Sequence, residues 1–259
     1  TARSVQQDAG YHRRRARIAV VDTGTDTDHQ SFSNAAWEYS LKLQAEKKGM
    51  SLEDYMASLD LMDAEGPDVV WPIPNGKVLK ENHVGKHILH YDSMLVLAHF
   101  KGHPMGGYGG ALKQLAIGCA SRAGKALIHS AGKTDDRFKT WEQHASSVVF
   151  PEAMADAASS VIEHFRGKIA FINVMKNLSV DCDCCAVAES PCMADIGIMA
   201  SLDPIAIDQA CVDMLYAATD DPGQKHMLER IESRHGIYTI ECAAELGFGS
   251  REYERVDLD

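Results

Sequence analysis

A short cysteine-rich segment carries the residues best suited to metal chemistry. It reads Asp181-Cys182-Asp183-Cys184-Cys185. In an extended backbone alternate side chains point the same way, so Cys182 and Cys184 would face one point. Because same-side residues are roughly 6.6 Å apart along a strand, the segment must bend before both sulfurs reach one ion at about 2.3 Å. We therefore expect Cys182 and Cys184 to bind a metal. The neighbouring carboxylates, Asp181 and Asp183, are the candidate further ligands.

The spacing of these cysteines leaves the kind of metal site open. It matches neither the Cys-x2-Cys pairs of a zinc ribbon nor the four-Cys run of a bacterial ferredoxin. Thiolates bind soft transition metals, so the expected cofactor is an iron-sulfur cluster or a single ion of Fe, Zn or Ni. The alternative is that the segment holds buried or incidental thiols without a ligand.

The chain contains seven cysteines, an uneven set unlike the disulfide framework of a secreted protein. Cys192 follows the cysteine-rich segment closely. Cys119, Cys211 and Cys242 stand in apolar helical contexts and are expected in the core. The set favours a reducing, cytoplasmic setting.

A loop rich in histidine and glycine forms the second candidate region. His99 and His103 could act as catalytic proton carriers or as ligands, although a hydrogen-bonded structural role is equally open for each. The glycines that could let the backbone approach a cofactor are Gly106, Gly107, Gly109 and Gly110. A helix expected to start near Ala111 could hold an anion on its free N–H groups, close to Lys113, the third candidate catalytic residue. The patterns of a phosphate loop and of a dinucleotide fold are absent.

Two aspartates follow a later strand-like run. Asp203 precedes Pro204, a pairing typical of a helix start, so Asp203 is suited to cap that helix. Asp208 is five residues further on and does not share a helical face with Asp203. We assign both to cofactor binding, with the cap as the simpler role for Asp203.

The alternation of short β-rich runs with longer helical patterns predicts an α/β protein. Strands are expected over 17–22, 93–98, 168–175 and 195–200, and helices from Ser51, Pro151 and Pro204. We expect residues 1–259 to form a single α/β domain with a mixed, mainly parallel sheet flanked by helices. Ligands collect beyond the carboxyl ends of parallel strands, so loops 99–110, 177–192 and 201–208 are expected to share one crevice.

Composition excludes several classes of protein. The net charge of −11 argues against a nucleic-acid surface, and the basic run over 13–17 is typical of a solvated face. No apolar run approaches the roughly 20 residues of a membrane span, and no signal peptide is recognisable. The expected partners are a small-molecule ligand or an electron-transfer protein, with no membrane and no nucleic acid. Whether the protein forms an oligomer is left open.

Three stretches of the sequence carry a family resemblance. They read HVGKHILHYDSMLVLAHFKGHPMGGYGGALKQLAIGCASRAGKALIHSAGK, SVDCDCC and DIGIMASLDPIAIDQACVDMLY. The chain from about Lys77 to Asp257 resembles the family called domain of unknown function three-six-two, often labelled uncharacterised iron-sulfur centre proteins. Many members carry an inserted four-Cys ferredoxin segment, which is missing here between His129 and Trp141. The resemblance implies metal binding at the Asp181 to Cys184 segment.

A more distant likeness is to the nickel-pincer lactate racemases. The spacing of His103, Gly107 and Lys113 is similar to their His-x3-Gly-x2-Gly-Gly-x-Lys loop. That likeness implies that Lys113 and His103 hold an organometallic cofactor.

Three functions are therefore open. The first is a metal or iron-sulfur binding protein, with a redox role in view. The second is a cofactor-dependent racemase or isomerase in which Lys113 anchors the cofactor and His99 or His103 moves a proton. The third is a non-catalytic protein that binds a small anion. Whether the protein is an enzyme is left open by the sequence.

Overall fold

A four-stranded sheet organises the protein. The computed structural model describes residues 18–21, 42, 45–58, 68–185 and 187–258. The strands of the main sheet lie in the order β1 (Ile18–Val21), β4 (Ser93–His99), β7 (Ile169–Met175) and β8 (Gly197–Ser201). These strands fall close to the four predicted runs. The basic run over 13–17 lies outside the described residues.

The direction of the strands corrects part of the fold prediction. In the main sheet β1 pairs with β4 and β4 with β7 in parallel, but β7 pairs with β8 antiparallel. The two small sheets are antiparallel hairpins, β2 (Val69–Pro72) with β3 (Glu81–Val84) and β5 (Lys101–His103) with β6 (Gly107–Gly109). An α/β protein with a mixed sheet is thus confirmed. A mainly parallel arrangement is not supported, because three of these five pairings are antiparallel.

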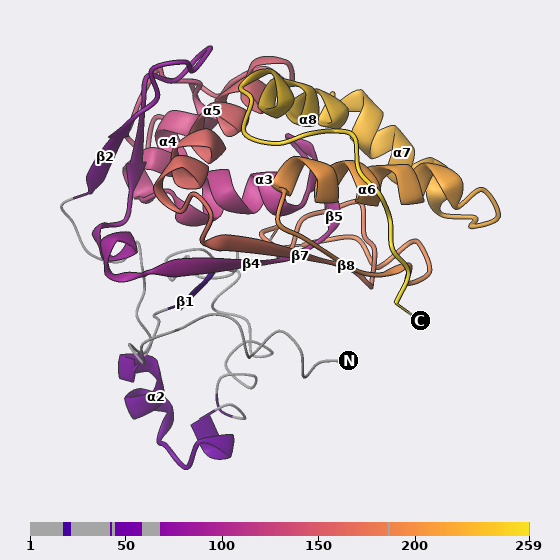
Figure 1. The fold of residues 1–259 in the computed structure, drawn as a ribbon, viewed down its shortest axis with the longest axis horizontal. Helices are drawn as coiled ribbons and strands as arrows, with labels where there is room; N and C mark the ends of the chain where they lie inside the picture. The colour runs from indigo at the N-terminus through magenta and orange to yellow at the C-terminus, as the bar shows by residue number, and fades with distance from the viewer. Residues whose placement is uncertain (1–17, 22–41, 43–44, 59–67, 186, 259) are drawn as a thin grey trace.

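Helices cover one side of the main sheet (Figure 1). Those on this side are α3 (Ala111–Lys113), α4 (Arg122–His129), α5 (Val149–His164), α6 (Pro204–Ala217), α7 (Gln224–Ser233) and α8 (Gly236–Glu245). The remaining helical segments are α2 (Leu52–Ser58), the 3₁₀ helix η2 (Lys86–His90) and the π-helix η3 (Gln114–Gly118). No helix in the described part of the chain is long and apolar enough to cross a membrane.

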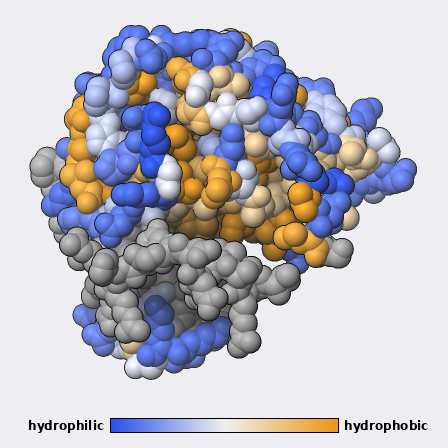
Figure 2. Space-filling view, viewed as in Figure 1, coloured by the Kyte–Doolittle hydropathy of each residue, from blue (hydrophilic) through white to orange (hydrophobic). Residues whose placement is uncertain are grey.

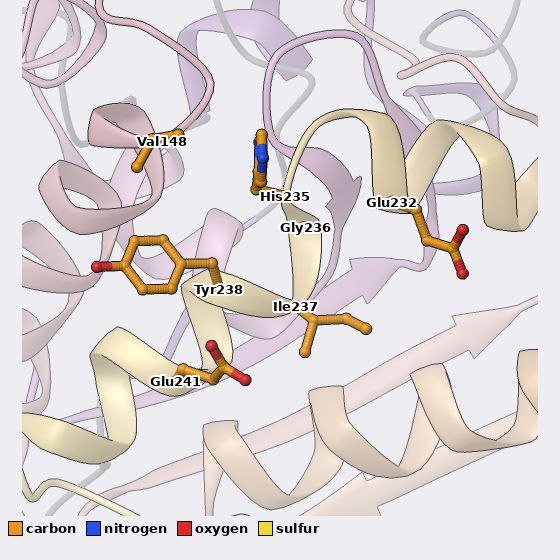
Figure 3. Close-up of a pocket in the computed structure, with 7 residues that line it drawn as sticks. All are labelled: Val148, Glu232, His235, Gly236, Ile237, Tyr238 and Glu241. Atoms are coloured by element: carbon orange, nitrogen blue, oxygen red, sulfur yellow. The ribbon is translucent and has the colours of Figure 1, made fainter.

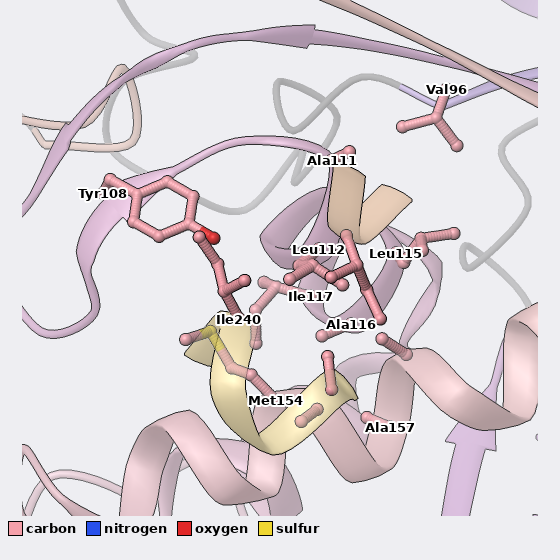
Figure 4. Packing of buried hydrophobic residues seen from close by; sticks show 14 of the residues in the cluster. Val96, Tyr108, Ala111, Leu112, Leu115, Ala116, Ile117, Met154, Ala157 and Ile240 are labelled. Carbon is pink, nitrogen blue, oxygen red and sulfur yellow. The ribbon is translucent and has the colours of Figure 1, made fainter. Parts of the chain in front are cut away.

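The hydrophobic core lies between the sheet and these helices. Alternate residues of β4 are buried, as strand geometry requires of a face that packs on helices. Figure 4 shows Val96 of β4 with Leu112 of α3, Met154 of α5 and Ile240 of α8 in this core. On the opposite face Leu97 is 40% exposed. Figure 2 shows hydrophobic residues gathered at the level of the strands.

Two predicted helix starts are confirmed by their capping contacts. Asp54 N donates to Ser51 Oγ at 3.0 Å, directly before α2. Asp203 Oδ1 accepts from Ile205 N at 2.8 Å and from Ala206 N at 3.1 Å at the start of α6. Each side chain satisfies backbone donors that have no partner within the helix.

Candidate metal centre

Close backbone packing brings the cysteine-rich segment against β5. Gly102 N donates to Ser179 O at 2.7 Å. A Cβ atom at Gly102 would lie 2.1 Å from Val180 O, a distance that real Cβ atoms do not adopt. Glycine at this position therefore allows residues 179–185 to lie directly beside the strand that carries His103.

The outcome is a compact group of metal-ligating side chains. The ligand atoms of His103, Cys182 and Cys184 all lie within 4.8 Å of one another. His103 and Cys182 are buried, and Cys184 is half-buried. The bend that the sequence required is a turn in which Cys185 N donates to Cys182 O at 2.9 Å. We call these three residues the His-Cys cluster.

The pKa values of the two cysteines are shifted in opposite directions. A hydrogen bond from Cys184 holds the pKa of Cys182 well below its usual range, against the effect of burial, and Lys113 and His103 act in the same direction. The same sulfur-sulfur hydrogen bond, together with burial, raises the pKa of Cys184. Cys182 is thus the thiolate of the pair, with the Cys184 thiol donating to it.

Lys113 lies beside this thiolate. Its Nζ is 3.5 Å from Cys182 Sγ, and the side chain is almost fully buried. Burial alone would lower the pKa of Lys113, but the neighbouring Cys182 and Cys184 outweigh burial and raise it. Lys113 is accordingly an ammonium group, placed here by the short helix α3.

His103 is held by the loop that follows it. Its Nδ1 accepts from Gly106 N at 2.9 Å and from Met105 N at 3.2 Å. A neutral imidazole has one N–H, so Nε2 carries the proton when Nδ1 accepts. Burial lowers the pKa of His103, which keeps the ring neutral although it hydrogen-bonds Cys182.

The acidic residues of the segment face cations instead of the His-Cys cluster. Asp183 Oδ2 lies 2.9 Å from Lys101 Nζ and 2.9 Å from His99 Nδ1. Burial acts to raise the pKa of Asp183, but the hydrogen bond from His99 and the charge of Lys101 prevail and lower it. Asp181 Oδ1 is 3.0 Å from Arg230 Nη1. Neither aspartate belongs to the His-Cys cluster, and their metal-binding role stays a prediction.

His99 is likewise outside the cluster. Its Nδ1 faces Asp183, and its Nε2 lies 2.7 Å from Lys176 O. Both partners are acceptors, so both ring nitrogens donate and the ring is an imidazolium. The hydrogen bond to Asp183 raises the pKa of His99. His99 thus has a hydrogen-bond partner at each ring nitrogen, and its catalytic role stays a prediction.

The backbone N–H groups at the helix start near Ala111 donate to a side chain of the same protein, the carboxylate of Asp208. Asp208 accepts from Ala111 N at 2.8 Å, Leu112 N at 3.0 Å and Tyr108 Oη at 3.0 Å. Burial raises the pKa of Asp208 to about 6, with these donors opposing the rise. A Cβ atom at Gly110 would lie 2.5 Å from Asp208 Oδ1. Gly110 and Asp208 thus pack against each other, and their assignment to cofactor binding stays a prediction.

Two other glycines of the loop also pack against protein. Gly107 has φ +79°, and its Cβ would lie 2.7 Å from Gly236 Cα in α8. A Cβ at Gly106 would lie 3.0 Å from Met154 Cε. Gly109 differs, because its nearest neighbours are Lys101 Cε at 3.6 Å and Lys113 Cδ at 3.7 Å. Of the four predicted cofactor-binding glycines, only Gly109 borders the lysines beside the cluster.

Asp203 lies at the opposite end of the sheet from the cluster. In the antiparallel register Ser201 pairs with Phe171, whereas Gly197 pairs with Met175 at the carboxyl end of β7. The loop after β8 therefore lies near the amino end of β7. There Asp203 caps α6 and accepts from Ser250 N at 2.8 Å. The expected crevice shared by Cys182, His103 and Asp203 is wrong for this reason.

The residues that line a surface hollow at the start of α8 include none of the predicted site residues (Figure 3). It is lined by Val148, Glu232, His235, Gly236, Ile237, Tyr238 and Glu241. In the close-up the labelled polar side chains do not converge on one point. We attach no function to this hollow.

Several residues near the cluster escaped the sequence analysis. Gly102 and Lys101 belong to the same strand as His103, β5, and only the packing partner of each reveals its role. His129 is the third, at the end of α4. Its Nδ1 lies 2.7 Å from Lys125 O, and its ring centroid is 5.1 Å from that of Phe150, which also stacks on His103. A lone histidine at a helix end gives no sequence signal for such a position.

His129 is expected to make the fold sensitive to acid. Burial lowers its pKa from the usual 6.5 of a histidine to about 4. Between these values the unfolded chain binds a proton that the folded protein excludes, so stability falls as the pH drops through this window. We expect a loss of about 2 kcal/mol from pH 7 to pH 4, after allowance for partial exposure. Urea unfolding at both pH values measures it.

The control for this pH effect is His129→Gln, which cannot titrate. Asp208 acts with the opposite sign in the same pH range, so the difference between wild type and His129→Gln isolates the histidine. Equal pH slopes for the two proteins would contradict the assignment.

The fold and the site together define a class: an α/β protein with a buried cluster of one histidine and two cysteines beside a lysine. Comparison of the sequence with known protein families identifies the family of the chain. A family described as Domain of unknown function (DUF362) matches residues 3–213. The chain therefore belongs to this family, and the match includes every residue of the His-Cys cluster. No curated protein matches the chain. No solved structure matches it either.

Proposed function

We propose that the protein binds a single transition-metal ion through Cys182, Cys184 and His103. The observation that carries the proposal is the approach of these three ligand atoms to within 4.8 Å of one another. Around a tetrahedral ion with metal-sulfur bonds of about 2.3 Å, two sulfurs are separated by roughly 3.8 Å. Small side-chain movements are therefore enough to close the cluster on an ion.

The donor set favours one ion over an iron-sulfur cluster. Clusters of two or four irons are held by four cysteine thiolates in most proteins. The His-Cys cluster supplies two cysteines, and Cys185 and Cys192 are not part of it. Two cysteines and one histidine are instead the protein ligands of a known type of catalytic zinc site, in which the fourth position stays open. A redox role would require iron or another redox-active ion at the same place.

The two cysteines are expected to bind more strongly than His103. The loop N–H groups hold Nδ1 as an acceptor, so Nε2 must release its proton, or the ring must turn, before His103 can bind an ion. Metal-bound histidines usually donate their second N–H, and that arrangement is absent here. Substitution of His103 is therefore expected to reduce metal affinity less than substitution of either cysteine.

Metal analysis of protein purified without oxygen tests the proposal. We expect about one equivalent of metal in the wild type, and a loss of affinity of at least about 100-fold in Cys182→Ser and in Cys184→Ser, because a thiolate ligand is lost. Cys185→Ser is the matched control, since this neighbour is outside the cluster and should retain full occupancy.

An absorption spectrum distinguishes the kinds of centre. A spectrum without visible bands is expected for zinc, whereas broad visible absorption with several irons per chain indicates a cluster. Full metal occupancy in both cysteine variants would contradict the proposal, and the segment would then be a reactive thiol pair.

A cofactor-dependent isomerase is the second candidate. It is favoured by Lys113, a buried cation 3.5 Å from Cys182 Sγ and next to the buried His103. Such a lysine could anchor an organic cofactor while His103 moves a proton. Mass spectrometry of the intact protein tests this candidate, since a covalently held cofactor adds mass that Lys113→Arg would lack.

A further inference from the structure

The lysine beside the cluster indicates which ligand the open position of the metal takes. We propose that a small carboxylate binds there and bridges the metal ion and the ammonium group of Lys113. The inference rests on the proposed function, because the ion supplies one of the two anchors. It adds the chemical class of the ligand, an organic acid of low molecular weight.

Charge balance around the filled site leaves Lys113 unmatched. A divalent ion and the thiolates of Cys182 and Cys184 are neutral together, because metal binding removes both thiol protons. The charge of Lys113 then has no counterpart in the cluster. Buried charge without a partner is costly, so an anion is favoured next to it.

The neighbouring carboxylates do not fill this role. Among the described residues, Asp183 forms ion pairs with Lys101 and His99, and Asp181 pairs with Arg230. Neither forms an ion pair with Lys113. An anionic ligand next to Lys113 would supply the balancing charge that neither of these two carboxylates supplies.

The geometry of the lysine suits a bridging anion. Nζ is 3.5 Å from Cys182 Sγ. A metal ion about 2.3 Å from the same sulfur would lie at most about 5.8 Å from Nζ. A carboxylate has two oxygens, so one can bind the ion at about 2.1 Å while the other accepts from the ammonium at about 2.8 Å.

Gly109 and Cys184 border this place. Gly109 has no side chain between the stems of Lys101 and Lys113, where a Cβ atom would make only ordinary contacts at 3.6 and 3.7 Å. Cys184, half-buried, is the least buried member of the cluster. The other anion-binding position of this region, the start of α3, is filled by Asp208.

Titration of Co²⁺-loaded wild-type protein with sodium acetate tests the inference, with acetamide as a neutral molecule of the same shape. Visible absorption of the bound Co²⁺ reports a change of its ligands. We expect a saturable spectral change with acetate and none with acetamide at equal concentration. Equal responses to both molecules, or no response to acetate, would overturn the inference.

Variants of Lys113 identify the anchor. In Co²⁺-loaded protein, Lys113→Met should bind acetate at least about tenfold more weakly than wild type, because a charge-assisted hydrogen bond is lost, and Lys113→Arg should retain most of the acetate affinity. Lys139→Met, a change of an exposed lysine, is the control. Full acetate affinity in Lys113→Met would refute the bridge. Failure of wild-type protein to bind Co²⁺ would instead overturn the metal centre itself.

Discussion

Gly102→Ala is expected to abolish metal binding and to lower the free energy of unfolding by about 3 kcal/mol or more, although residue 102 is no ligand. The added Cβ would lie 2.1 Å from Val180 O and 2.5 Å from Val180 C. Both atoms are backbone, so no side-chain movement relieves the collision. The segment that carries Cys182 and Cys184 has to move away from His103 instead.

Gly109→Ala is the matched control for this change, because it adds the same methyl group in the same hairpin of β5 and β6. Its Cβ makes contacts of 3.6 and 3.7 Å with lysine side chains, which are ordinary packing distances. Urea unfolding and metal content should both stay close to wild type in Gly109→Ala. Retention of metal by Gly102→Ala would show that the segment does not depend on this packing.

Asp208→Ala is expected to destabilise the protein by roughly 3 to 5 kcal/mol, with no exposed surface involved. The carboxylate accepts from Ala111 N, Leu112 N and Tyr108 Oη, and from Asn173 Nδ2 at 2.8 Å. Removal of the carboxylate leaves these buried donors without an acceptor and opens a cavity. Thermal unfolding at pH 7, where the carboxylate is ionised, measures the loss.

Asp213→Ala provides the comparison on the same helix. Asp213 is exposed and accepts from Gln209 and Tyr253 near the surface. Surface contacts of this kind contribute about 0 to 1 kcal/mol, so Asp213→Ala should unfold close to wild type. Similar destabilisation by both changes would show that Asp208 is no special anchor.

The sequence predicted the strands and caps because these depend on local patterns. The apolar runs over 93–98 and 168–175 identify β4 and β7, and Ser51 and Asp203 cap helices as expected. The pairing of Cys182 with Cys184 was also within reach, since it needed only alternation and a bend. Such inferences use neighbours in the chain alone.

The direction of β8 could not be read from its residues. An apolar run of five residues fits a parallel or an antiparallel strand equally well, and only the path of the preceding loop decides between them. Because β8 is antiparallel to β7, Asp203 lies at the far end of the sheet and not in the expected crevice.

The glycine-rich loop shows a second limit of sequence reasoning. A run of glycines indicates that something approaches the backbone closely, but it does not reveal what. Here Gly110 admits Asp208 and Gly107 admits α8, so two glycines expected to face a cofactor face the protein itself. The partner in each case lies about 100 residues or more away in the sequence, beyond any local pattern.

The contacts of α7 and α8 show that the region matched by the family is not structurally independent of the rest of the chain. The family match ends at residue 213, yet Asp181 pairs with Arg230 of α7, and Gly107 packs against Gly236 of α8. Both loops that build the His-Cys cluster therefore depend on a part of the chain beyond the match. A polypeptide shortened to the matched region would retain all three residues of the His-Cys cluster. It would lose two contacts that hold them in place.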